Sequence, residues 1–326
     1  MVYLPRHDKH TRKKSYKSYF FFFFLLLLTG VGYYYRSGIL GLFFGSETKR
    51  LMRISAKIQE EFSRNGAEIK TIDEYLSISR DYLKNHPQDA SANHLYAVGH
   101  YYKIRFVGMF MPGKILEIAY AEGVTDLVSR SPELHLPLDE MYRFSLAARA
   151  ISNDSGMLNN EILILSGEVF RGIKRNESIL AEFKKLKEPD PELRLLYYWT
   201  GLVLSVLTGD IAYFEQLLKN PSFPLVFKEN ELNFLKGYLY YSGKDYLRAL
   251  NFLRMKTSQE NPDIQFYSSL IESVIFFKQN LPGKALLILE ELYKVNPGKQ
   301  TVIRKKFMEM KMLMPSLESS VIIPAS

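Results

Sequence analysis

The sequence predicts an all-α protein, an α-solenoid of antiparallel helical hairpins that follows one N-terminal transmembrane helix. Three observations support this fold class. Apolar residues recur with helical spacing almost throughout residues 46–314, turn residues interrupt that spacing at short intervals, and an uncharged apolar run lies near the N-terminus. The chain has no cysteine, which excludes disulfide bonds, thiolate chemistry and Cys-ligated zinc.

The net charge of +8 is concentrated at the N-terminus. Residues 1–18 carry six basic groups and one acidic group, a balance of +5, whereas the rest of the chain carries 37 basic and 34 acidic groups. That remainder shows no basic stripe of the kind that neutralises a row of phosphates. Nucleic acid is therefore not an expected partner.

The segment after the basic residues is typical of a membrane anchor. Residues 20–35, FFFFFLLLLTGVGYYY, contain no charged side chain, and a helix of this length spans roughly 24 Å of a hydrocarbon core of roughly 30 Å. The apolar residues 39–44 can extend it. We expect a transmembrane signal-anchor over residues 19–45, with residues 1–18 as a basic cytoplasmic tail and the rest exported across a bacterial-type inner membrane. The alternative is a cleaved signal peptide, because basic residues, an apolar run and small residues also fit that plan.

Residues 232–263 illustrate a helical hairpin. Four apolar or aromatic side chains form a helical stripe in the first half, and four more recur at i, i+3, i+4 and i+7 in the second. These residues are Phe234, Leu235, Tyr238 and Tyr241, then Tyr246, Ala249, Leu250 and Leu253. Gly243 is expected to end the first helix as a left-handed cap, and Asn261-Pro262 to end the second. Gly237 and Ala249 are expected to let the two backbones approach closely.

The order of residues in this hairpin resembles the tetratricopeptide repeat family, whose unit contains about 34 residues. The residues that carry the resemblance are Gly237, Tyr240, Gly243, Tyr246, Ala249, Leu253 and Pro262. The following unit repeats it with Ser273, Phe276, Ala285, Leu289 and Pro297, and a looser preceding copy has Gly201, Leu204, Gly209, Leu217 and Pro221. Small residues at 99, 167, 201, 237 and 273 are separated by 68, 34, 36 and 36 positions. The resemblance implies stacked helix pairs.

The expected organisation after the anchor has five parts. They are N-terminal repeat-like helices over 46–106, an irregular helical segment over 107–156, repeats over 157–300, a polar-faced capping helix over 301–314, and a frayed tail over 315–326. Within the irregular segment the repeat register is lost, and a helix at about 137–151 has no evident partner.

Residues 108–115, GMFMPGKI, have the glycines and lysine of a phosphate-binding loop. Such a loop needs Ser or Thr directly after the lysine, because that hydroxyl ligates Mg²⁺, and here Ile115 follows Lys114. The flanking segments are helical in period, so we expect a turn between helices. The six histidines lack the spacing of metal ligands and are expected at turns or on the surface. We expect no catalysis, cofactor or metal.

The remaining candidate is a binding surface. In tetratricopeptide repeats one face of each first helix lines an inner groove, and the resemblance implies that this face binds a protein or peptide. The candidate groove residues are Tyr96, His100, Tyr198, Leu202, Phe234, Tyr238 and Tyr241. For each of them the alternative is packing against a neighbouring helix. The expected function is a membrane-tethered scaffold for protein–protein interactions in the cell envelope. The alternative is a secreted or periplasmic component that binds a ligand or a transporter partner.

Overall fold

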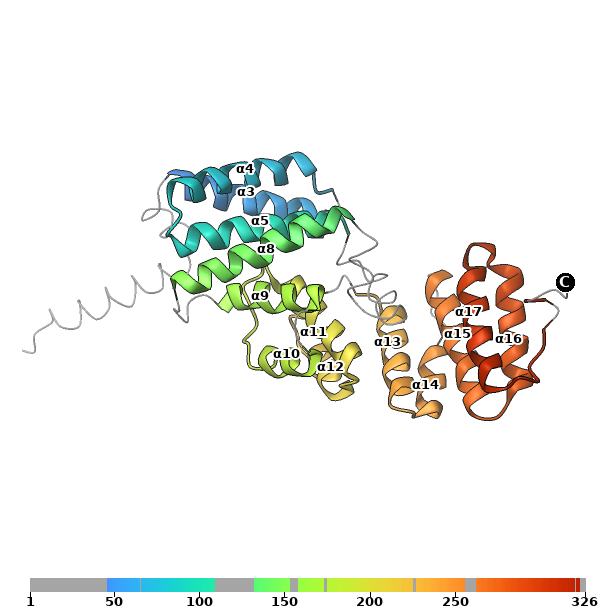
Figure 1. Cartoon of the computed structure of the whole chain (residues 1–326). Helices are drawn as coiled ribbons and strands as arrows, with labels where there is room; N and C mark the ends of the chain where they lie inside the picture. Colours follow the sequence, from blue (N-terminus) through green and yellow to red (C-terminus); the bar gives the residue numbers. More distant parts are fainter. Residues whose placement is uncertain are drawn as a thin grey trace, which may run out of the picture. The chain divides into compact units, whose positions relative to one another are not determined.

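The described residues of the computed structural model are all-α. They are residues 46–322 except 65, 109–131, 153–157, 173–174, 225–226, 256–261 and 320 (Figure 1). Within these ranges the regular elements are 13 α-helices and one short 3-10 helix, with no strand. The prediction of an all-α, repeat-like helical fold is confirmed. The chain divides between Glu60 and Glu61 into two compact units.

The expected membrane anchor over residues 19–45 lies outside the described residues, as does the basic tail before it. In the part of the chain that the structure covers, no helix is both long enough and apolar enough to span a bilayer. The first described helix, α3 (Ser46–Ser63), is amphipathic, with Leu51, Ile54 and Ile58 buried at helical spacing.

Four helices form the N-terminal part of the second unit. They are α4 (Ile69–Asn85), α5 (Ala90–Phe106), α8 (Pro132–Ile151) and α9 (Leu158–Arg171). Consecutive helices of this group pack against each other, so α8 lies against both α5 and α9 (Figure 1). The expectation that a helix at 137–151 lacks a partner is therefore wrong. It begins five residues earlier, at Pro132, and its interior contains Pro137.

Two glycines of the predicted series face a different neighbour from the one expected. A Cβ at Gly99 would lie 2.7 Å from Leu76 Cδ2 on α4, and a Cβ at Gly167 would lie 2.8 Å from Tyr142 Cδ2 on α8. Both glycines therefore admit the preceding helix, not the following one. The spacing of small residues therefore predicts the repeat length in this region, but it does not predict the helix pairs. Each glycine packs against the helix before its own helix, whereas the repeat pattern pairs it with the helix that follows.

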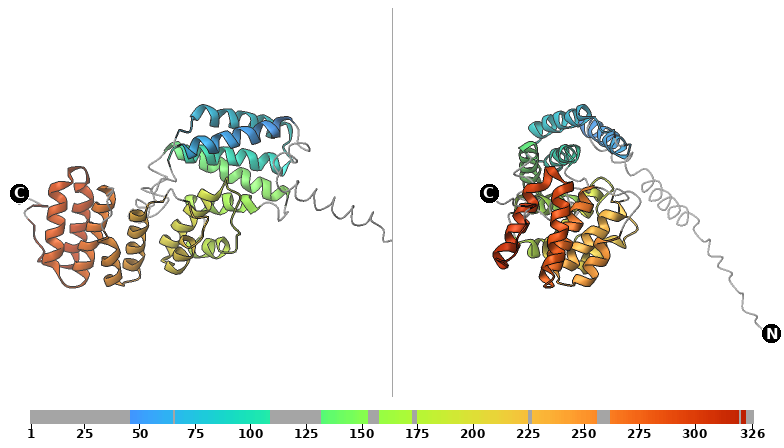
Figure 2. Two further views of the ribbon diagram at one scale, coloured as in Figure 1. Left: turned by 180° about the vertical axis from the view of Figure 1, so that it is seen from behind. Right: turned by 90° about the vertical axis from the view of Figure 1, so that its right-hand side faces the viewer.

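The C-terminal part of the second unit repeats a long helix followed by a second helix. The helices are α10 (Asn176–Phe183), α11 (Arg194–Thr208), α12 (Ile211–Leu218), α13 (Glu229–Ser242), α14 (Tyr246–Leu253), α15 (Pro262–Lys278), α16 (Pro282–Val295), the 3-10 turn η2 (Pro297–Lys299) and α17 (Gln300–Leu313). Within this series α11 packs on α12, α13 on α14, and α15 on α16. Figure 2 shows the orange and red helices of residues 262–313 side by side. Pro262, expected to end a helix, begins α15.

The close approach predicted at Gly237 is confirmed. A Cβ there would lie 2.7 Å from Leu253 Cγ and 3.2 Å from the Leu253 backbone nitrogen on α14. Gly201 on α11 meets Leu217 on α12 in the same way, at 2.8 Å from Cδ1. In both hairpins the small residue of the first helix lies against a leucine that follows it by 16 positions.

The turns inside three successive hairpins share one hydrogen-bond pattern. A backbone N–H donates to the carbonyl five residues earlier, over 2.9–3.0 Å, and the residue before that donor has a positive φ. The donors are Asp210, Asp245 and Leu281, and the positive-φ residues are Gly209, Lys244 and Asn280. Gly243 was expected to adopt this left-handed conformation, but its φ is −76°, and Lys244 adopts it instead. The recurrence of this turn at 209, 244 and 280 supports a structural repeat, and it is a separate observation from the spacing of the small residues at 99, 167, 201, 237 and 273.

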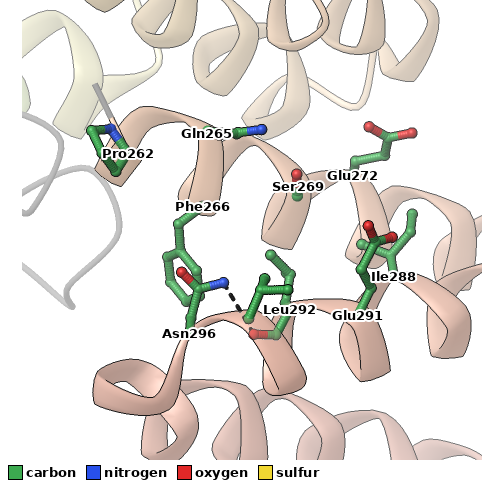
Figure 3. Close-up of a pocket in the computed structure, with 10 residues that line it drawn as sticks. Pro262, Gln265, Phe266, Ser269, Glu272, Ile288, Glu291, Leu292 and Asn296 are labelled. Atoms are coloured by element: carbon green, nitrogen blue, oxygen red, sulfur yellow. Dashed lines mark hydrogen bonds between the residues drawn. The ribbon is translucent and has the colours of Figure 1, made fainter. Parts of the chain in front are cut away.

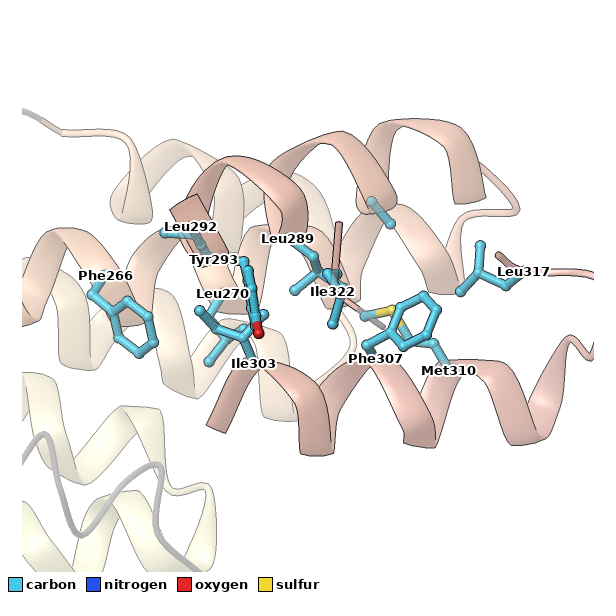
Figure 4. Packing of buried hydrophobic residues seen from close by; sticks show 11 residues of the cluster. Phe266, Leu270, Leu289, Leu292, Tyr293, Ile303, Phe307, Met310, Leu317 and Ile322 are labelled. Atoms are coloured by element: carbon cyan, nitrogen blue, oxygen red, sulfur yellow. The ribbon is translucent and has the colours of Figure 1, made fainter. Parts of the chain in front are cut away.

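The C-terminal helices enclose a continuous apolar cluster. Helices α15, α16 and α17 contribute Phe266, Leu270, Ala285, Leu289, Leu292, Tyr293, Ile303, Phe307 and Met310, and the segment after α17 contributes Leu317 and Ile322 (Figure 4). The expectation of a frayed tail is wrong for the described residues 315–319, 321 and 322, because burying these two apolar side chains holds them against the helices. Residues 323–326 of the expected tail lie outside the described residues. The backbone N–H of Ile322 also donates to Ser319 Oγ, which in turn donates to Glu290 Oε1.

Candidate functional site

The structure separates the predicted groove residues into two groups. Five of the seven are buried and pack among neighbouring helices: Tyr96, His100, Tyr198, Leu202 and Phe234. Tyr238 and Tyr241, both on α13, remain partly exposed. Packing therefore accounts for the first five side chains, and only the two tyrosines are available for contact with a partner.

His100 is buried and was expected at a turn or on the surface. Neither of its ring nitrogens has a hydrogen-bond partner in the described part of the chain, and its ring meets the Tyr96 ring edge-on with centroids 4.7 Å apart. Burial, with smaller effects of the Lys103 and Arg80 charges, lowers the pKa of His100 to about 4. The imidazole is therefore neutral at pH 7 and belongs to the packing of α5.

Tyr238 and Tyr241 form an aromatic patch next to α15. Their ring centroids are 6.2 Å apart, and the Lys278 Nζ lies 5.0 Å from the Tyr241 centroid. A cation over an exposed aromatic ring contributes about 0.5–1 kcal/mol. The patch thus consists of two aromatic side chains from α13 and one positive charge from α15, the first helices of two successive hairpins. A partner could contact all three side chains.

A pocket that sequence reasoning did not identify lies between α15 and α16. Its volume is about 470 Å³, and it is lined by Pro262, Gln265, Phe266, Ser269, Glu272, Ile288, Glu291, Leu292, Val295 and Asn296. Figure 3 shows Phe266 and Asn296 toward one end, with Glu272 and Glu291 toward the other. The pocket therefore combines apolar side chains with two carboxylates on opposite helices.

The two carboxylates of the pocket differ in their partners. Glu272 accepts hydrogen bonds from Arg254 at the end of α14, one of them from Nε over 3.1 Å, and this contact raises the pKa of Arg254. Glu291 is exposed, and it forms no ion pair within the described residues. A cation that entered the pocket would meet one available carboxylate and one that already holds an arginine.

The sequence contains a weak signal for this pocket. Gln265, Ser269 and Glu272 follow one another at i, i+4 and i+7, so they form a polar stripe on α15. Such a stripe ordinarily faces solvent. Only the packing of α15 on α16 shows that it borders a pocket whose other wall contains Ile288 and Glu291.

The GMFMPGKI segment lies outside the described residues apart from Gly108. This glycine follows α5 with a φ of 89°, and its backbone N–H donates to the carbonyl of Arg105. Over the ranges that the structure covers, no three His, Asp or Glu side chains come together as metal ligands would.

Comparison with known proteins adds no family. No protein-family model, curated protein or solved structure matches this chain. The assignment of the candidate site therefore depends only on the geometry of its own residues.

Proposed function

We propose that this protein is a membrane-tethered helical-repeat scaffold, of tetratricopeptide type, that binds a protein partner in the cell envelope and has no catalytic activity of its own. The single observation that carries the proposal is the pocket between α15 and α16, where an apolar wall lies beside two carboxylates. The repeat assignment is supported by the 34- to 36-residue spacing of small residues and by the three equivalent turns.

The pocket suits a peptide that presents an apolar side chain next to a lysine or arginine. Its volume lies within the range of about 300–1,000 Å³ that is typical of ligand sites. The apolar side chain would contact Phe266 and Leu292, and the cation would pair with Glu291. Arg254 already holds Glu272, so a second cation at that carboxylate would have to compete with it.

The tether is proposed from the N-terminal sequence. A balance of +5 over residues 1–18 precedes an uncharged 16-residue run, which favours a cytoplasmic N-terminus and an exported C-terminal domain at a bacterial-type inner membrane. A reporter that is active only outside the cytoplasm, fused after Ser326, should be active, and the full-length protein should stay in the membrane fraction. Release of a chain that begins near residue 33 would instead support the secreted or periplasmic alternative.

The binding proposal is tested by selecting peptides from a displayed random library on the full-length chain. We expect enriched peptides to contain an apolar residue beside a basic one. The variant Glu291→Gln should weaken their binding about tenfold, which corresponds to about 1.4 kcal/mol. The control Glu177→Gln removes an exposed carboxylate from α10 and should change nothing. Selection of no consensus, or equal binding to both variants, would contradict the proposal.

A further inference from the structure

The exposed face of α17 carries apolar side chains that the fold leaves uncovered. Met308 and Met312, four positions apart, are 46% and 74% exposed, while Ile303, Phe307 and Met310 on the opposite face pack into the apolar cluster (Figure 4). Leu313, the last residue of the helix, is 80% exposed. A polar-faced capping helix was expected here. Methionine is flexible and polarisable, so surfaces that contain it can adapt to a partner.

We propose that this face of α17 binds an amphipathic helix of a partner protein, and that the polar side of that helix is acidic. In the preceding hairpins, every first helix from α11 to α15 is covered by a second helix of the same chain. In contrast, α17 follows α16 as the next long helix, and the described residues after it, up to 322, contain no further helix. A helix supplied by the partner would take the place that α12, α14 and α16 occupy in the chain itself.

The charge of α17 indicates the chemistry of the partner. The helix carries Arg304, Lys305, Lys306 and Lys311 against Glu309 alone, a net charge of +3. Lys306 forms an ion pair with Glu309, and Arg304 donates to the hydroxyl of Tyr293, which leaves its charge uncompensated. Glutamate or aspartate beside the apolar stripe of the partner would complement this surface.

The same charge argues against a second copy of the chain as the occupant. Antiparallel packing of two α17 helices would bring two surfaces of charge +3 together, which is unfavourable. An anionic membrane surface has the right charge but needs a large apolar face, because binding strength increases with the apolar area buried. The principal apolar stripe of α17 is turned into the protein core and is not available to lipid.

The test uses the full-length chain in nanodiscs of zwitterionic phosphatidylcholine and two synthetic amphipathic helices. Both helices carry a leucine stripe, and their polar faces contain glutamate in one and lysine in the other. We expect the glutamate helix to bind at least tenfold more tightly in a fluorescence anisotropy titration. High salt should weaken this binding, because the Debye length falls from about 10 Å at 0.1 M to about 3 Å at 1 M.

Variants assign the binding to α17. Met312→Glu should weaken binding of the glutamate helix at least tenfold, and Met312→Ser should weaken it less. The matched control is Met255→Glu, since Met255 is an exposed methionine, 51% accessible, but lies after α14. Unchanged circular dichroism of each variant checks that it is folded.

The inference adds a second surface to the proposed partner-binding function, and the two can fail separately. Glu291→Gln should leave the glutamate helix bound, because the pocket and α17 are separate. Equal binding of the lysine helix, or no effect of Met312→Glu, would overturn the inference. Dimerisation that Met312→Glu abolishes would assign the face to a second copy instead. Flotation of the nanodisc-held chain with anionic vesicles, in the absence of peptide binding, would assign it to lipid.

Discussion

A methyl group added at Gly237 tests the packing of α13 against α14. The new Cβ of Gly237→Ala would lie 2.7 Å from Leu253 Cγ, 2.8 Å from its Cδ2 and 3.2 Å from its backbone nitrogen. Leu253 cannot avoid all three contacts by rotating its side chain, because one of them is to the backbone. The two helices would have to move apart, and overpacking of this kind costs about 1–3 kcal/mol.

The net effect is smaller, because alanine favours a helix over glycine by about 1 kcal/mol. We therefore expect Gly237→Ala to destabilise the hairpin by up to about 2 kcal/mol. Gly201→Ala should be close to neutral, since its nearest neighbour is Leu217 Cδ1, the end of a flexible side chain, at 2.8 Å. Gly283→Ala on α16 meets no atom within 4 Å and should be neutral or stabilising.

The assay is amide hydrogen exchange followed by mass spectrometry. A repeat array opens locally, so peptides that span α13 and α14 report on this hairpin without requiring the whole chain to unfold. Gly237→Ala should lower their protection, and Gly283→Ala should not. Equal protection in the two variants would refute the close contact between α13 and α14 and the hairpin packing inferred from it.

Three further predictions concern side chains whose burial the sequence predicted wrongly or left open. His100→Gln should flatten the pH dependence of stability in urea unfolding between about pH 4 and 6.5. The reason is that a folded-state pKa of about 4 for His100 costs the wild type up to about 3 kcal/mol of stability as the pH falls through this window. Ile322→Ala should cost about 2–5 kcal/mol in thermal unfolding, whereas no change would indicate a frayed tail. Tyr238→Ala and Tyr241→Ala should weaken partner binding by about 2 kcal/mol with little change in melting temperature; unfolding instead would place both rings in the core.

The sequence was sufficient to predict the C-terminal hairpins because their signals are local. The apolar stripe that begins at Tyr246 becomes α14, which starts at that residue, and Ala249 and Gly237 lie buried at the contact between α13 and α14. The sequence predicted the left-handed turn residue one position too early, at Gly243. Lys244 adopts the left-handed conformation next to Gly243, because the turn is set by the hydrogen bond from Asp245 to Tyr240 and not by the glycine alone.

Features that depend on contacts between distant residues could not be predicted in the same way. The spacing of Gly99 and Gly167 gives the repeat length, but it does not show which neighbouring helix each glycine admits. The pocket needs Glu272 and Glu291, 19 positions apart, on facing helices. Burial of His100 and Ile322 likewise follows from neighbours that only the folded chain brings together.

The pocket between α15 and α16 is tested most directly by photocrosslinking in living cells at two positions of one helix. Val295 lines the pocket and is 66% exposed, and Leu287 is 68% exposed on α16 but does not line it. With p-benzoylphenylalanine at position 295, we predict capture of one discrete protein, lost when Glu291→Gln is added. At position 287 we predict no such product. Capture of the same protein from both positions, or of none from either, would contradict the assignment of the pocket as the partner-binding site.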